Sequence, residues 1–204
     1  MCSASDWNMI EVDEDFSPDY IHYSRFSGTV RLGKFAGEFE LAGGMKKHAG
    51  LYHVTLHNVT VDDDCCIENV KNYIANYNIG SHTFIENVDI ILTDCFSSFG
   101  NGVEVSVMSE TGGREVMIYD RLSAQTAYLM AQYRERKELQ SRLDDMVSAY
   151  VEGVKSDVGT IGQDVTIADA GYIKNVRIGD ACKIEGAARL KNGSINSNQA
   201  DPVH

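Results

Sequence analysis

The sequence predicts a mainly β protein built as a parallel β-helix, whose coils are interrupted by an inserted β-hairpin and α-helix. Three observations predict this fold class. Identical residues recur at a spacing of 18, aliphatic residues recur every six positions within that repeat, and residues 92–154 follow neither period. A repeat that cannot bury its apolar side alone must stack on its neighbours.

Identical residues carry the 18-residue repeat. Ile67–Val70 reads Ile-Glu-Asn-Val and is repeated as Ile85–Val88, while Asn58 recurs as Asn76, and a third copy begins at Ile173. Alternating Val and Ile would also suit a β-sandwich, but a sandwich does not require identical residues at a fixed spacing. The repeat therefore favours a β-helix.

The six-residue period describes one strand and one corner. One phase contains Val61, Ile67, Tyr73, Ile79, Ile85 and Ile91, and a later one contains Ile161, Ile167 and Ile173. Three units make one coil, whose aliphatic side chains stack on the next coil at about 4.8 Å. Corners need residues that tolerate left-handed backbone angles, and we expect Gly33, Gly80, Gly162, Gly179 and Asp62 there. We expect Glu68, Glu86 and Glu185 to point from other corners into solvent.

The chain divides into four parts. Residues 1–25 lead into the repeat, residues 26–91 form β-helix coils, residues 92–154 form the insertion, and residues 155–204 return to coils. We expect these last coils to be truncated, as part of a longer repeat protein. Within the insertion, alternation of Val with polar residues around a glycine turn over residues 103–119 predicts a β-hairpin.

The second half of the insertion predicts an amphipathic helix. Residues 121–152 contain no glycine or proline, and their apolar residues follow helical spacing. We expect a break near residues 134–137, a cap from Asp120 or Ser123 at the start, and Gly153 at the end. A segment of this size is expected to pack on an outer face of the coils or on a neighbouring subunit.

Composition limits the partners and the compartment. With 30 acidic and 18 basic residues, the formal charge is −12, which argues against nucleic acid or an anionic membrane as partner. No apolar run approaches the roughly 18–20 residues of a membrane span. Five cysteines in no disulfide-framework pattern, together with the absence of an export signal, predict a cytoplasmic protein.

The hexads resemble the hexapeptide-repeat superfamily of left-handed β-helices, which includes sugar-nucleotide acyltransferases and commonly forms trimers. Several runs also resemble an uncharacterised bacterial family of hexapeptide-repeat proteins: Gly28–Gly33, Gly43–Gly50, Ile74–Tyr77, Phe99–Val105 and Glu110–Val116. The superfamily resemblance implies left-handed coils, a homo-oligomer with a trimer favoured, and acyl transfer to a sugar or sugar nucleotide. It also implies an acyl-CoA or acyl-carrier donor, whereas the narrower family implies no function.

This resemblance implies a histidine that acts as general base and takes a proton from the acceptor. His48 is the candidate, because it lies in the glycine-bounded basic segment Gly43–Gly50. Lys46 and Lys47 beside it are candidates for binding a phosphate or a cofactor pyrophosphate. We expect His57 at a corner and His82 in a strand to be ordinary surface residues.

A second group of candidate substrate-binding residues lies in the insertion. It consists of Asn101, Glu104, Glu110 and Arg114, which stand among glycines together with Glu115. Polar residues on glycine-rich loops commonly serve binding. An internal ion-pair network that holds the hairpin to the β-helix would use the same residues, so both readings stay open.

Two other function classes remain open. The first is a non-catalytic scaffold or binding module. The second is a zinc-dependent hydratase, because the carbonic-anhydrase branch of the superfamily uses three histidines and this chain has the pair His48 and His53 with His82 beyond it. In that branch the single histidine precedes the pair, whereas here it follows, so we assign no metal ligand. No phosphate-loop or dinucleotide motif occurs.

Overall fold

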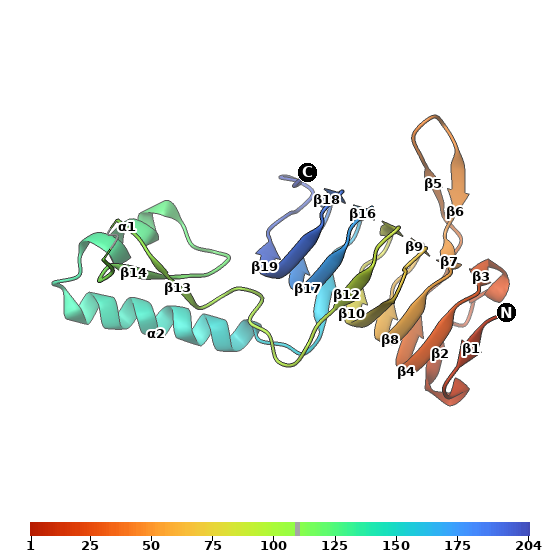
Figure 1. Cartoon of the computed structure of the whole chain (residues 1–204), viewed down its shortest axis with the longest axis horizontal. Coiled ribbons are helices and arrows are strands. Elements are labelled where there is room, and N and C mark those ends of the chain that lie inside the picture. The colour runs from red at the N-terminus through yellow and green to blue at the C-terminus, as the bar shows by residue number, and fades with distance from the viewer. Residues whose placement is uncertain (109–110) are drawn as a thin grey trace.

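The computed structural model describes residues 1–108 and 111–204, and parallel β-structure dominates it. Within these residues, a nine-stranded and a six-stranded sheet run along one elongated stack, and two α-helices lie beyond its end (Figure 1). We use the word coil for one pass of the chain through both sheets. The protein is mainly β, as predicted.

The nine-stranded sheet consists of β1 (Ser3–Ala4), β2 (Ile10–Val12), β4 (Arg25–Leu32), β8 (Thr55–Val61), β10 (Tyr73–Ile79), β12 (Ile90–Leu92), β15 (Gly159–Ile161), β17 (Tyr172–Ile178) and β19 (Arg189–Ile195). The six-stranded sheet consists of β3 (Ile21–His22), β7 (Gly50–Tyr52), β9 (Cys66–Glu68), β11 (Phe84–Glu86), β16 (Thr166–Ala168) and β18 (Lys183–Glu185). Two short 3-10 helices, η1 (Trp7–Met9) and η2 (Pro18–Tyr20), lie near the N-terminus. The chain passes between the sheets in turn, which is consistent with a parallel β-helix.

Strand registers confirm the repeat. Ile67 pairs with Ile85 at a spacing of 18, and Leu56 pairs with Ile74 at the same spacing. After the insertion the spacing shortens to 17, because Ile167 pairs with Ile184. Paired residues in neighbouring parallel strands point to the same side, so one aliphatic row runs through the stack. The left-handed sense of the coils stays a prediction from the resemblance.

The interior of the stack contains the predicted aliphatic rows with one correction. Ile67, Ile85 and Ile167 are completely buried in one continuous apolar cluster. Tyr73, which was predicted to share their phase, is 38% exposed, and its neighbour Ile74 is buried instead. The alternation changes phase because the chain turns a corner at Asn76, inside β10.

Asparagines form the same corner in four of the coils. Asn58, Asn76, Asn175 and Asn192 all have φ between 51° and 56°, a left-handed conformation that asparagine tolerates well. Their side chains form a ladder between coils: Asn58 Nδ2 donates to Asn76 Oδ1 at 3.2 Å, and Asn175 Nδ2 donates to Asn192 Oδ1 at 3.2 Å. The recurring asparagines therefore have a structural role.

Glycines at another corner serve a different purpose from the one predicted. Gly33, Gly80, Gly162, Gly179 and Asp62 do not have positive φ, so left-handed geometry does not explain them. A Cβ on Gly80 would lie 2.7 Å from the backbone of Gly162, and one on Gly162 would lie 2.3 Å from Asp180 Oδ1. At Gly80 and Gly162 the next coil approaches too closely for a side chain, whereas Asp62 occupies the equivalent corner of its own coil.

The insertion forms an arm, which we define as residues 93–158 with Ser109 and Glu110 outside the description. Its hairpin of β13 (Val103–Ser106) and β14 (Glu115–Ile118) is antiparallel, as predicted. Its helical part is divided into α1 (Ala124–Gln132) and α2 (Lys137–Val154), which confirms the break. Ser123 caps α1 by accepting a hydrogen bond from the Thr126 amide at 3.1 Å, whereas Gly153 lies inside α2 and does not end it.

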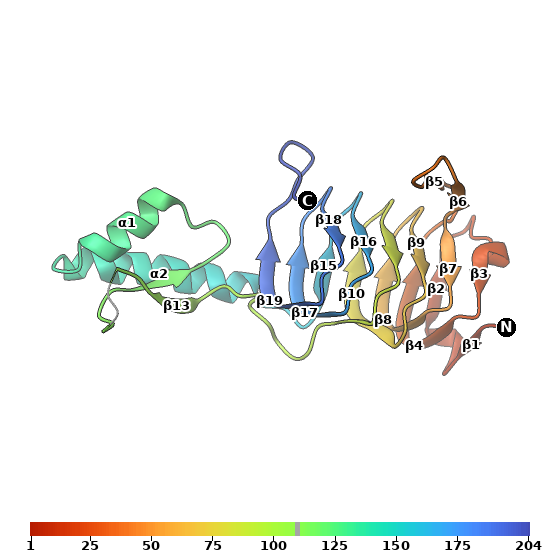
Figure 2. The same cartoon turned by 45° about the horizontal axis from the view of Figure 1, so that its top comes forward.

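The arm extends beyond the β19 end of the stack in both views, instead of covering an outer face (Figures 1 and 2). It has a small apolar core of its own, which includes Val116, Met130 and Val147. The apolar side chains of the arm bury one another in this core, so they do not need an outer face of the coils to exclude water. The arm therefore does not pack on an outer face of the coils, and the other alternative, packing on a neighbouring subunit, stays a prediction.

The arm leaves and returns at a single corner of one coil. Residues 73–75 of β10 pair with β12, and residues 77–79 of the same strand pair with β15. The ring of Tyr77 is completely buried at this junction, where a Cβ on Gly159 would lie 2.4 Å from its Cζ. The Tyr77 hydroxyl donates to the Val176 carbonyl at 2.7 Å and accepts from the Val176 amide at 3.2 Å. Tyr77 thus joins the coils on either side of the arm.

Replacing Tyr77 with phenylalanine tests this role. Tyr77→Phe leaves the buried amide and carbonyl of Val176 without their partner, so we expect a loss of about 1–3 kcal/mol in the free energy of unfolding. Urea unfolding followed by circular dichroism measures the loss. Tyr73→Phe, in the same strand but exposed, is the matched control and should unfold like the wild type. Equal stability of the two variants would contradict the role.

Candidate functional site

A second hairpin projects from the side of the stack (Figure 1). It consists of β5 (Glu38–Glu40) and β6 (Lys46–His48), antiparallel, with Phe39 opposite Lys47. At its base Phe39 packs against Phe84 with ring centroids 5.4 Å apart, and the Lys47 ammonium lies 5.7 Å from the same ring. Because Phe84 belongs to β11, the hairpin base contacts the outer side of the six-stranded sheet. The sequence predicted only a projecting basic segment here.

His48 is held at the base of this hairpin. Its ring is parallel to that of Tyr20, with centroids 3.5 Å apart, and its Nδ1 lies 2.8 Å from the carbonyl oxygen of Ala49. If Nδ1 carries the proton, Nε2 is left as the acceptor. Gly50 makes room for this packing, since a Cβ there would lie 2.3 Å from the Tyr20 carbonyl. The general-base role of His48 stays a prediction.

The two neighbouring lysines have partners within the chain. Lys47 forms an ion pair with Glu68, and the two side chains are only 20% and 13% exposed. Lys46 forms an exposed ion pair with Glu38 at 3.3 Å. Both cations are therefore matched by carboxylates, which weakens the expectation that they bind a phosphate. We predicted that Glu68 points into solvent. This was wrong, because the hairpin covers Glu68.

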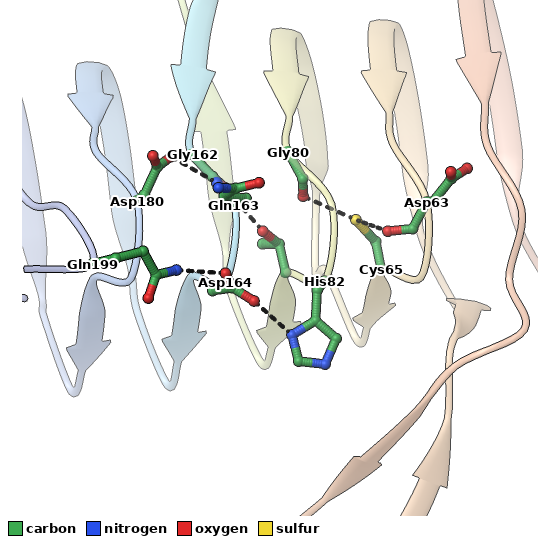
Figure 3. A network of polar contacts seen from close by, with 10 residues as sticks. Asp63, Cys65, Gly80, His82, Gly162, Gln163, Asp164, Asp180 and Gln199 are labelled. Atoms are coloured by element: carbon green, nitrogen blue, oxygen red, sulfur yellow. Dashed lines mark hydrogen bonds and ion pairs between the residues drawn. The ribbon is translucent and has the colours of Figure 1, made fainter.

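His82 has the more developed acid–base geometry. Its Nδ1 lies 2.8 Å from Asp164 Oδ1, and Gln199 Nε2 donates to the other carboxylate oxygen, Asp164 Oδ2, at 2.6 Å. Figure 3 shows His82 and Asp164 on neighbouring turns at one edge of the stack, with Gln199 reaching Asp164 from the segment after β19. The structure thus forms a histidine–aspartate pair in which both oxygens of the acid are engaged.

The surroundings of His82 orient its ring. Asp164 favours the tautomer with the proton on Nδ1, which leaves Nε2 to accept a proton. Figure 3 shows this second nitrogen directed away from Asp164. Phe39 of the hairpin stacks on the ring with centroids 4.8 Å apart and planes at 15°. The side chain remains 55% exposed, so a ligand on the surface can reach it.

Sequence reasoning missed this pair for two reasons. His82 has φ of 56° and lies at a corner, not in a strand as predicted, and positive φ is uncommon for residues other than glycine. Its partner Asp164 is 82 residues away, across the arm. The sequence did contain one signal for a corner at His82, which is its spacing of 18 residues from Asp64. In the structure Asp64 lies at the preceding corner and also has positive φ.

The candidate residues of the arm are not brought into one site. Asn101 is 3% exposed, with Oδ1 accepting from the Asp120 amide and Nδ2 donating to the Ser98 carbonyl, both at 2.7 Å. Glu104 lies on β13 and Arg114 just before β14, both exposed, while Glu110 lies outside the described residues. Asn101 therefore fastens the base of the arm. Arg114 forms no ion pair with any residue that the structure describes.

Over residues 1–108 and 111–204, no group of three or more His, Cys, Asp or Glu side chains is arranged to hold a metal ion. His48 stacks on Tyr20, and His53 stacks on Tyr23 with centroids 4.8 Å apart.

The part of the chain that the structure describes contains no helix that is both long and apolar enough to cross a membrane.

Adjacent cysteines have different environments. Cys65 belongs to the interior cluster, and burial raises its pKa to about 12. Cys66 faces the other way and is still completely buried, close to Lys47 and Tyr52 beneath the hairpin. Burial raises the pKa of Cys66 to about 11, although the Lys47 ammonium opposes the shift. All five cysteines are free thiols.

Parallel sheets of repeating strands, with candidate functional side chains at coil corners and at the base of a hairpin, define a repeat protein consistent with the parallel β-helix class. The chain belongs to the family described as Domain of unknown function (DUF4954), whose model matches residues 1–204. It is 27% identical over 208 residues to an uncharacterised protein of Treponema pallidum (strain Nichols). That match covers 97% of this chain and 29% of the relative, so the chain spans less than a third of the relative's length. No solved structure matches.

Thiol alkylation tests the description of the hairpin base. With a pKa of about 11, roughly one part in a thousand of Cys66 is thiolate at pH 8, and the hairpin covers it. We therefore expect iodoacetamide to modify the exposed Cys95 much faster than Cys66, as measured by peptide mass spectrometry. Unfolding in urea should remove the difference. Equal rates in the folded protein would show that the hairpin does not cover Cys66.

Proposed function

We propose that this chain takes part in acyl transfer, with His82 as the general base. The observation that carries the proposal is the hydrogen-bonded pair of His82 and Asp164, with Gln199 on the second oxygen of the acid. A histidine oriented by a carboxylate is suited to accept a proton near neutral pH. The resemblance to hexapeptide-repeat acyltransferases supports the reaction class.

The pair can carry out the proton transfers that acyl transfer from a thioester requires. An acceptor hydroxyl or amine gives its proton to His82 Nε2 as its oxygen or nitrogen attacks the carbonyl carbon of a thioester. Asp164 stabilises the imidazolium that forms. The carbon–sulfur bond then breaks, and the imidazolium returns the proton to the departing thiolate. The acyl group ends on the acceptor, and the donor leaves as a free thiol.

The resemblance of the sequence to the superfamily also indicates the donor, the acceptor and the oligomeric state that belong to this proposal. Acyl-CoA or an acyl carrier would be the donor, and a sugar or sugar nucleotide would be the acceptor. The superfamily resemblance supports left-handed coils, a trimer and a transferase-like activity. The five free thiols are consistent with a reducing cytoplasm. His48 is the second candidate base, because its Nδ1 contact with Ala49 also leaves Nε2 as an acceptor.

A non-catalytic binding module is the second candidate function. Five cavities in the described part of the chain, with volumes of about 260 to 560 Å³, have no histidine in their walls. Sites for small molecules are usually concave. A substrate at His82 would lie outside these five cavities, on the exposed surface around the ring or on a surface completed by another subunit, whereas a binding module needs no histidine.

Substitution of single histidines separates these functions. Purified protein is mixed with acetyl-CoA and a panel of amino sugars and sugar nucleotides, and loss of thioester absorbance at 232 nm is recorded. Because general-base catalysis contributes about 100-fold or more, we expect His82→Ala to lower kcat by about that factor. Asp164→Asn should lower it less, since the base remains but loses its orienting charge.

Two further variants complete the experiment. His57→Ala is the matched control, because His57 is also at a corner but both of its ring nitrogens are engaged. Nδ1 lies 2.8 Å from Ser27 Oγ, and Nε2 lies 3.1 Å from Asn58 Nδ2. His48→Ala tests the other candidate base. Full turnover in His82→Ala with loss in His48→Ala would move the role to His48. Full turnover in both variants, with unchanged circular dichroism, would overturn the assignment of a histidine base.

A further inference from the structure

Two adjacent cavities lie where the arm meets the coils. The first has a volume of about 400 Å³ and the second about 260 Å³. Their walls have Arg121 and Tyr150 of the arm and Arg177 of β17 in common. We call this region the junction groove. It contains neither His82 nor His48, so it is separate from the proposed acyl-transfer site.

The coil side of the junction groove is a row of polar side chains on neighbouring strands. Asn78 of β10 pairs with Thr160 of β15, and the pairing of Ile161 with Ile178 places Thr160 beside Arg177. All three side chains are exposed and line the first cavity. An amide, a hydroxyl and a guanidinium therefore face the same space, at the spacing of about 4.8 Å between strands.

The arm side is fixed by contacts of Asp120. The Tyr150 hydroxyl donates to Asp120 Oδ1 at 2.5 Å, and Asn196 of the coils donates to the Asp120 carbonyl. The Arg121 guanidinium lies 5.3 Å from the centroid of the Tyr150 ring, within the range of a cation–π contact. The groove is thus held open by the fold itself and does not need a ligand to form.

The charge of the junction groove is unusual for this chain. Neither Arg121 nor Arg177 forms an ion pair within the described part of the chain, although acidic residues outnumber basic ones by 30 to 18. Arg31, by contrast, pairs with Glu11 at 3.1 Å. The other charged groups facing the groove are Asp120, whose Oδ1 is engaged by Tyr150, and Lys155, which pairs with Glu152.

We propose that the junction groove binds the diphosphate group of a small phosphorylated molecule, between Arg121 on the arm and Arg177 on the coils. A guanidinium matches the oxygens of a phosphoryl group in bidentate geometry, and one arginine on each wall suits two linked phosphoryl groups. Asn78 and Thr160 are placed to donate further hydrogen bonds. The first cavity, of about 400 Å³, falls in the range of roughly 300–1,000 Å³ that small-molecule sites occupy, and the smaller second cavity adjoins it.

Isothermal titration calorimetry with inorganic pyrophosphate tests the proposal, in 150 mM sodium chloride without divalent cations. We expect one site per chain, with inorganic phosphate bound at least tenfold more weakly. Arg121→Gln and Arg177→Gln should each weaken pyrophosphate binding at least tenfold, because each removes one charge-assisted contact. Arg177→Lys keeps the positive charge but loses the planar guanidinium that can donate two parallel hydrogen bonds. This variant should bind pyrophosphate with intermediate affinity.

Arg31→Gln is the matched control. Arg31 belongs to the same outward row as Asn78, through Thr60 between them, but its charge is already paired with Glu11. The control should bind pyrophosphate like the wild type, and thermal melting should show that all four variants remain folded. No binding by the wild type, equal affinity for phosphate and pyrophosphate, or an equal effect of Arg31→Gln would each overturn the proposal.

Discussion

The fold depends on one constraint: every coil must place its aliphatic side chains directly on those of the coil before it. Strands paired in parallel are about 4.8 Å apart, which leaves no room for a gap or an extra layer between neighbouring isoleucines. The corners must therefore repeat as faithfully as the core. Asparagines with left-handed backbone angles and glycines with no room for a Cβ satisfy this condition at different corners.

Insertions are tolerated only at the corners, for the same reason. A residue added within a strand would turn every following side chain to the wrong side. The arm leaves one coil at its asparagine corner and returns there, and Tyr77 fills the space opposite Gly159. The hairpin of β5 and β6 likewise lies between β4 and β7. The regular stack keeps its register, and both insertions bring new side chains to its surface.

These rules explain how far the sequence predicts the structure. The repeat, the hairpin of the arm and the broken helix are local patterns, and they were predicted correctly. Tyr73 and Gly80 were misread, because phase at a corner and closeness of the next coil depend on residues in other coils. Contacts across the arm were harder still. His82 and Asp164 are 82 residues apart, so no spacing within one repeat reveals the pair.

The same geometry separates structural from functional polar residues. A polar side chain that repeats from coil to coil, such as Asn58 on Asn76, satisfies its neighbour and is explained by the stack. Side chains that break the repeat need another reason. His82 stands where other coils have Asp64 or Asp164. Arg31 and Arg177 share one outward row, but only Arg31 has an ion-pair partner among the described residues. In a chain of net charge −12, these exceptions place the proposed base and an arginine with no ion-pair partner in the described part of the chain beside insertions, where a ligand can meet both coil and insertion.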